Sequence, residues 1–85
     1  MRTFDYTIKD ELGIHARPAG ILAKTAKALD SEITISLGEK SVAATKLMAL
    51  MGMGIKCGNT ITVTINGGDE AASEKAMQEF FEANL

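Results

Sequence analysis

Alternation of apolar and polar residues predicts the strands of this chain. In residues 3–8, Phe4, Tyr6 and Ile8 alternate with polar residues, which is the period-two pattern of a strand with one buried face. The pattern recurs twice, and a two-residue turn with glycine first, Gly38-Glu39, joins the first of these repeats to a shorter strand. We therefore expect strands at residues 3–8, 33–37, 40–43 and 60–65.

Residues 16–29 have the spacing of an amphipathic helix. The lysines Lys24 and Lys27 fall on the face opposite the apolar one. The apolar face is formed by Ala19, Leu22, Ala26 and Leu29. Gly20 interrupts this segment at a cost of about 1 kcal/mol relative to alanine, and its bare backbone would let a partner approach closely.

A second helix of similar length is predicted at residues 70–83, with Asp69 as its N-cap. Glu74 and Glu79 are expected to face water. The residues expected to be buried are Ala72, Ala76, Met77 and Phe80.

A short helix at residues 46–51 carries more large apolar side chains than one face can bury. We assign Met51 to the core together with Leu50 and Ile14. Leu47 and Met48 are expected to stay partly exposed and to form an adaptable apolar surface.

The element order is therefore βαββαβα, which indicates the α+β class. The predicted fold is an open-faced β-sandwich, with a four-stranded antiparallel sheet covered on one face by three helices. We expect residues 1–85 to form a single domain, since this length supports one modest core.

Composition excludes several functions. The net charge of −2 argues against a general binder of nucleic acid or of anionic membranes. No apolar run is long enough to span a bilayer, and the N-terminal residues do not resemble a signal peptide. The single cysteine, Cys57, cannot form an internal disulfide and is assigned to a turn without redox function, so a cytoplasmic location is expected.

Candidate chemistry gathers around the only histidine, His15, and the only proline, Pro18. Proline is accepted in the first turn of a helix, so Pro18 predicts a helix start at about Ala16. The free N–H groups of Ala16 and Arg17, the positive end of the helix dipole and the Arg17 guanidinium would then favour an anion beside the imidazole. These groups suit phosphoryl transfer to a neutral nitrogen nucleophile, and we expect neither a metal nor a cofactor.

The segment Leu12-Gly13-Ile14-His15-Ala16-Arg17-Pro18-Ala19, the later stretch 46–54 and the element order resemble those of the HPr family. Members of this family are histidine-containing phosphocarriers of the sugar phosphotransferase system. The resemblance implies that His15 accepts a phosphoryl group on Nδ1 from the phosphohistidine of enzyme I and passes it to a IIA domain of a sugar permease. Phosphoenolpyruvate would be the ultimate donor, and the chain would act as a monomeric stoichiometric carrier, not an enzyme.

The resemblance also assigns a docking surface for enzyme I and the IIA domains, made of Gly20, Lys24, Lys27, Leu47 and Met48. Lys46 departs from the family, because most members have a serine there that is a regulatory phosphorylation site in many of them. The carrier function does not depend on that serine.

Two other functions compete with the carrier. An HPr-like binding module could regulate a transcription factor or an enzyme without transferring phosphoryl groups. A small-molecule or RNA-binding sandwich is less well supported, because the chain lacks a glycine-rich phosphate loop, exposed paired aromatics and a basic stripe.

Overall fold

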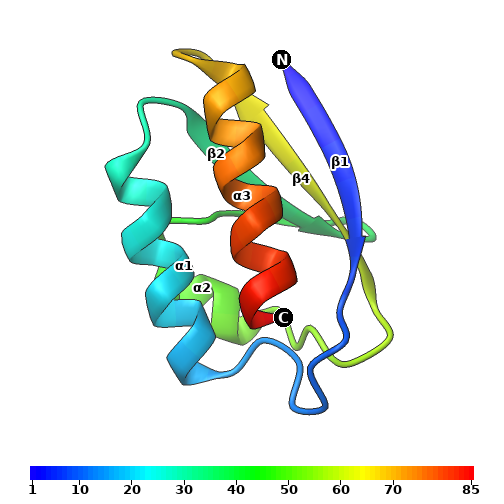
Figure 1. The fold of residues 1–85 in the computed structure, drawn as a ribbon. Helices are drawn as coiled ribbons and strands as arrows, with labels where there is room; N and C mark the ends of the chain where they lie inside the picture. Colours follow the sequence, from blue (N-terminus) through cyan, green and yellow to red (C-terminus); the bar gives the residue numbers. More distant parts are fainter.

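The computed structural model describes residues 1–85. Its elements are β1 Arg2–Thr7, α1 Ala16–Ala28, β2 Glu32–Leu37, β3 Lys40–Ala43, α2 Leu47–Gly52, β4 Thr60–Asn66 and α3 Glu70–Asn84. The four strands form one antiparallel sheet with the order β1-β4-β2-β3 (Figure 1). The predicted βαββαβα order and fold class are confirmed, with boundaries within one residue of those expected.

Strand register puts apolar residues on one face of the sheet. Val63 of β4 is opposite Phe4 of β1 on one side and Ile35 of β2 on the other, so the three form a row across the sheet. The adjacent row contains Thr3, Thr64 and Thr34 and faces away from the core. Between β2 and β3, Gly38 has a φ of 59°, as the predicted glycine-first turn requires.

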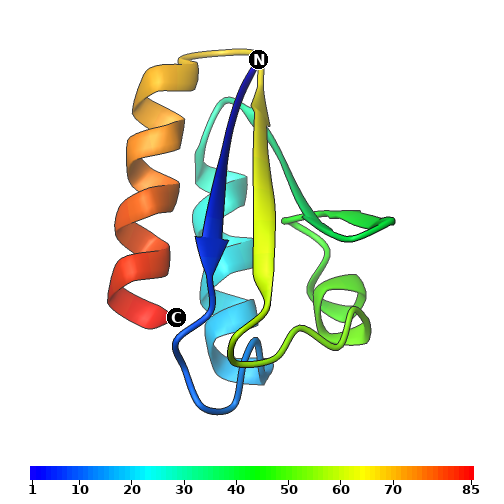
Figure 2. The ribbon, with the colours of Figure 1, turned by 90° about the vertical axis from the view of Figure 1, so that its right-hand side faces the viewer.

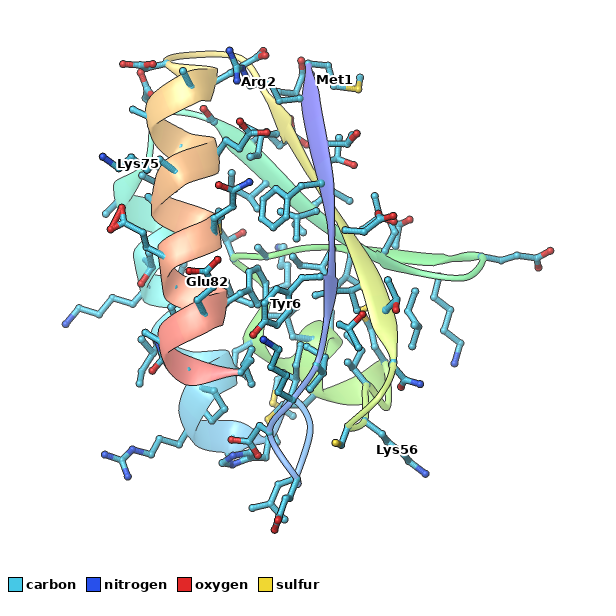
Figure 3. The ribbon with its side chains drawn as sticks, turned by 45° about the vertical axis from the view of Figure 1, so that its right-hand side comes forward. Met1, Arg2, Tyr6, Lys56, Lys75 and Glu82 are labelled. Atoms are coloured by element: carbon cyan, nitrogen blue, oxygen red, sulfur yellow. The ribbon has the colours of Figure 1, made fainter.

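The helices α1 and α3 lie over the apolar face of the sheet, and α2 packs against α1 and β3 (Figures 1 and 2). Phe81 of α3 packs against β1, with its ring centroid 6.3 Å from that of Phe4 and 5.3 Å from that of Tyr6. Figure 3 shows the Tyr6 side chain between β1 and α3, near Glu82. Burial, and to a lesser extent the Glu82 carboxylate, raises the pKa of Tyr6 above its ordinary value.

The predicted inner face of α1 is largely confirmed, since Ala19, Leu22 and Ala26 are buried and Leu29 is partly buried. In α3, Met77 and Phe80 are buried as predicted and Asp69 caps the helix by accepting from Ala72 N–H at 3.2 Å.

Two predictions for α3 are wrong. Ala72 is exposed, and Ser73 takes the buried position instead. Ser73 can do so because its hydroxyl pairs with that of Ser31 at 2.7 Å, so the buried oxygen has a hydrogen-bond partner. Glu74 is half-buried and does not simply face water, because its carboxylate pairs with Arg2 at 2.9 Å.

Met51 was also wrongly assigned to the core, since it is 41% exposed. The helix α2 has only six residues, and its inward face holds Leu50. Met53, three residues after Leu50, points to the same side as Leu50 and is 6% exposed. Its N–H donates to Leu50 O. Met51 lies about 100° around the helix from Leu50 and therefore points toward solvent.

Candidate functional site

The site begins where α1 begins. His15 is the N-cap residue with extended backbone (φ −109°), and its carbonyl accepts the first helical hydrogen bond from Ala19 N–H at 3.0 Å. The helix starts at Ala16, as Pro18 predicts. The N–H groups of Ala16 and Arg17 precede the first helical hydrogen bond, and Pro18 has no N–H, so the helix start presents free donors.

Contacts with the segment after α2 fix the chain just before His15. Gly13 has a φ of 68°, and a Cβ at this position would collide with the carbonyl oxygen of Ile55. Ile14 is buried, and its N–H donates to that same oxygen at 3.1 Å. Position 13 needs both a positive φ and the absence of a Cβ, and only glycine meets these two requirements. Gly13 and Ile14 together therefore fix the chain segment that leads into α1.

A hollow of about 270 Å³ opens beside the imidazole. The residues that line it are Asp10, His15, Arg17, Pro18, Ile21, Ala83 and Asn84. The His15 side chain is 37% exposed, so the ring is accessible to a partner. Its Nε2 lies 3.9 Å from Oδ1 of Asp10.

Sequence reasoning missed Asp10 and Asn84. Asp10 belongs to the polar loop that leads to His15. A carboxylate so close to the histidine in sequence is the feature that could have identified it as a site residue. Asn84 reaches the site because the end of α3 packs onto the loop, where Leu85 O accepts from Lys9 N–H at 2.6 Å and from Asp10 N–H at 2.9 Å. Figures 1 and 2 show the C-terminal end beside the loop between β1 and α1.

The five residues of the predicted docking surface lie on two helices that pack against each other, α1 and α2 (Figure 1). Met48 is 79% exposed and Leu47 37% exposed, as expected. Lys24 and Lys27 are exposed too, and apart from the neighbouring residues and backbone of its own helix, nothing lies within 4 Å of where a Cβ on Gly20 would be. All charged residues of α1 are basic.

Fold and site together define a small α+β protein whose only histidine is exposed at the N-cap of a helix with free N–H groups. The HPr family model, described as the PTS HPr component phosphorylation site, matches residues 2–83. The chain belongs to the HPr family. This membership confirms the predicted role as a phosphocarrier of the phosphotransferase system.

Known relatives agree with this assignment. The chain is 39% identical to the phosphocarrier protein HPr of Mycoplasma capricolum over 79 residues, which cover 93% of this chain and 89% of that protein. It is similar to the solved mycoplasma histidine-containing phosphocarrier protein, with a TM-score of 0.89, 38% identity and coverage of 93% and 90%.

The structure of HPr-C-His from Thermoanaerobacter tengcongensis is also similar, with a TM-score of 0.91, 32% identity and coverage of 98% and 93%. HPr from that organism has also been solved as a dimer, to which this chain is similar with a TM-score of 0.76. The comparisons give the regulatory alternative no better support. None of the helices in this chain has the length and apolarity to cross a membrane.

Proposed function

We propose that His15 accepts the phosphoryl group on Nδ1 from the phosphohistidine of enzyme I and passes it to a IIA domain of a sugar permease. The observation that carries this proposal is the position of the only histidine, at the N-cap of α1 with its side chain 37% exposed. The chain then acts in the cytoplasm as a stoichiometric carrier, charged and discharged once per transfer.

The surroundings of His15 suit this reaction. Phosphoryl transfer passes through a loose transition state whose charge lies on the equatorial oxygens, so the protein contributes mainly position and positive potential. The N–H groups of Ala16 and Arg17 and the positive end of α1 supply this potential from the backbone. Arg17 lines the same hollow as His15, and its guanidinium adds a full positive charge.

The docking surface supports a shared binding site for enzyme I and the IIA domains. Met48 and Leu47 are exposed apolar groups on α2, and flexible methionine side chains adapt to more than one partner. Lys24 and Lys27 on α1 provide positive charge beside them, and Gly20 leaves space for close approach.

We propose that residues 1–85 act as a single HPr domain and as a monomer, which size-exclusion chromatography with light scattering tests directly.

A two-stage transfer experiment tests the carrier function. The protein is incubated with enzyme I and labelled phosphoenolpyruvate, isolated, and mixed with a IIA domain. We expect acid-labile label on this chain after the first stage and its passage to IIA in the second. Binding to enzyme I without any label would instead favour the regulatory binding module.

A further inference from the structure

The carboxylate beside His15 belongs to Asp10, a residue to which the proposed function assigns no role. Asp10 Oδ1 lies 3.9 Å from His15 Nε2, within ion-pair range but too far for a direct hydrogen bond. Both side chains line the hollow, and Arg17 is the only other charged residue that does. The nitrogen that meets Asp10 is therefore Nε2, the one that the proposed function does not use.

Three hydrogen bonds hold Asp10 in this position. Its Oδ1 accepts from Leu12 N–H at 2.8 Å, and its carbonyl oxygen accepts from Gly13 N–H at 2.9 Å. Its own N–H donates to Leu85 O at 2.9 Å. The side chain is 31% exposed. The carboxylate is thus fixed by the loop and by the end of α3, unlike a freely rotating surface charge.

We propose that Asp10 is a positioning residue that keeps the ring proton of neutral His15 on Nε2 and leaves the lone pair on Nδ1. Neutral imidazole carries one N–H, and a neighbouring carboxylate favours the tautomer whose N–H faces it. The inference rests on the proposed function, since the tautomer matters for transfer only if Nδ1 is the acceptor.

In the transfer step, the Nδ1 lone pair forms the new N–P bond, and the electron pair of the breaking P–N bond returns to the donor nitrogen. The donor imidazole carries a proton on its second nitrogen and leaves as neutral imidazole. His15 keeps its Nε2 proton and becomes a phosphoimidazolium. Positive charge develops on the His15 ring during the step, and the Asp10 carboxylate stabilises it.

A negative charge at this position also has an opposing effect, because it repels the phosphoryl oxygens. The charge is next to Nε2, whereas the phosphoryl group would be attached to Nδ1 and face the helix start and Arg17. The two effects have opposite signs, so removing the charge shows which one is larger.

The test uses Asp10→Asn, whose amide oxygen can still accept from Leu12 N–H, so the loop is retained while the charge is removed. The ¹⁵N chemical shifts of the His15 ring report the tautomer ratio over a pH titration. We expect the ratio of the Nε2–H to the Nδ1–H tautomer to fall about two- to fivefold, which is the size of effect that one partly exposed charge pair typically has on an equilibrium. The single-turnover rate of transfer from phosphorylated enzyme I, at saturating donor, should fall by a similar factor.

Glu11→Gln is the matched control, because it removes an adjacent exposed carboxylate that forms no hydrogen bond or ion pair with His15. This variant should change neither the tautomer ratio nor the rate at saturation. An unchanged tautomer ratio in Asp10→Asn would overturn the inference, as would a shifted ratio without a slower transfer, or a faster transfer. If the wild-type protein accepts no phosphoryl group, the proposed function fails, whereas the ring shifts still decide whether Asp10 sets the tautomer.

Discussion

At His15 and Arg17, backbone and side chain contribute different parts of the site. In the proposed transfer, His15 at the N-cap would supply the nucleophile, and the backbone N–H of Arg17 belongs to the helix start that would bind the phosphoryl oxygens. Arg17 is exposed and is one of the residues that line the hollow beside the imidazole. Truncating its side chain should leave the helix start intact and remove only the guanidinium charge.

For Arg17→Ala we expect the single-turnover transfer rate to fall by about tenfold or more, with a smaller loss of affinity for enzyme I. The physical reason is that a charge aimed at the phosphoryl oxygens acts mainly where charge is redistributed in the transition state. Rapid-quench kinetics and calorimetric titration measure the two effects separately. Equal losses of rate and affinity would make Arg17 a docking residue instead.

For individual site residues, the sequence could predict only those that are close to His15 along the chain. Ala16, Arg17 and Pro18 follow His15 directly, so their arrangement depends on one helix start that proline marks. Asp10 and Asn84 lie at the same site because the end of α3 packs onto the loop before α1, through the hydrogen bonds that Leu85 O accepts. Apolar periodicity contains no information about that tertiary contact.

Among the elements, α2 shows why the buried face of a short helix is hard to predict from sequence. A helix of six residues makes fewer than two turns, so its sequence does not fix which face is buried. Met53, just beyond the helix, fills the core position that Met51 was expected to fill.

Met53→Ala should lower the free energy of unfolding by about 2–5 kcal/mol, because it leaves a cavity in the core. Met51→Ala is the matched variant and should cost less than about 1 kcal/mol, since Met51 is 41% exposed. Urea unfolding followed by circular dichroism measures both. Equal losses for the two variants would contradict the packing described for α2.

Lys46 is the exposed N-cap residue of α2, next to the docking surface, and its side chain makes no capping hydrogen bond. A cation at the N-terminal end of a helix typically costs a few tenths of a kcal/mol to about 1 kcal/mol of helix stability, because it faces the positive end of the helix dipole. Helix stability therefore does not favour a lysine here. We expect instead that Lys46 attracts acidic surfaces on enzyme I or IIA. Lys46→Glu should lower the association rate with these partners, and the loss should shrink as salt is raised.

Lys75→Glu is the control for Lys46→Glu, because it makes the same change of charge on α3, where Figure 3 shows the lysine pointing away from the molecule. Stopped-flow association at several salt concentrations compares the two variants. A salt-independent effect of Lys46→Glu, or an equal effect of Lys75→Glu, would exclude a local electrostatic contact.

For the whole molecule, chain order was predictable but strand neighbours were not. Alternation identifies β1 and β4 as strands, yet only the fold makes β4 pair with both β1 and β2. The same topology brings the start of β1 beside the start of α3, at the end remote from the start of α1 (Figures 1 and 3). There the Met1 amine pairs with Glu70 at 2.8 Å and Arg2 with Glu74 at 2.9 Å.

The Met1 amine, then the Gly67 N–H, and more weakly Arg2, hold the pKa of Glu70 below its ordinary value. Folding thus favours the Glu70 carboxylate, and this stabilisation is present at neutral pH and lost as the pH falls through the lowered pKa. Glu70→Gln should unfold at lower urea than wild type at pH 7. The difference should shrink once the pH falls below the ordinary glutamate pKa of about 4.3 and vanish below the lowered pKa of Glu70. A difference of the same size at pH 7 and pH 3 would show that charge is not its cause.

The most direct test of the account is to charge the wild-type protein and His15→Ala with enzyme I and labelled phosphoenolpyruvate and to locate the label. We expect one acid-labile phosphoryl group on the wild-type protein and none on the variant. Circular dichroism should be the same for both, because His15 lies at the surface end of α1 and contributes little to the core. Acid-labile phosphorylation of His15→Ala would contradict the account, as would label on the wild-type protein at any residue other than His15.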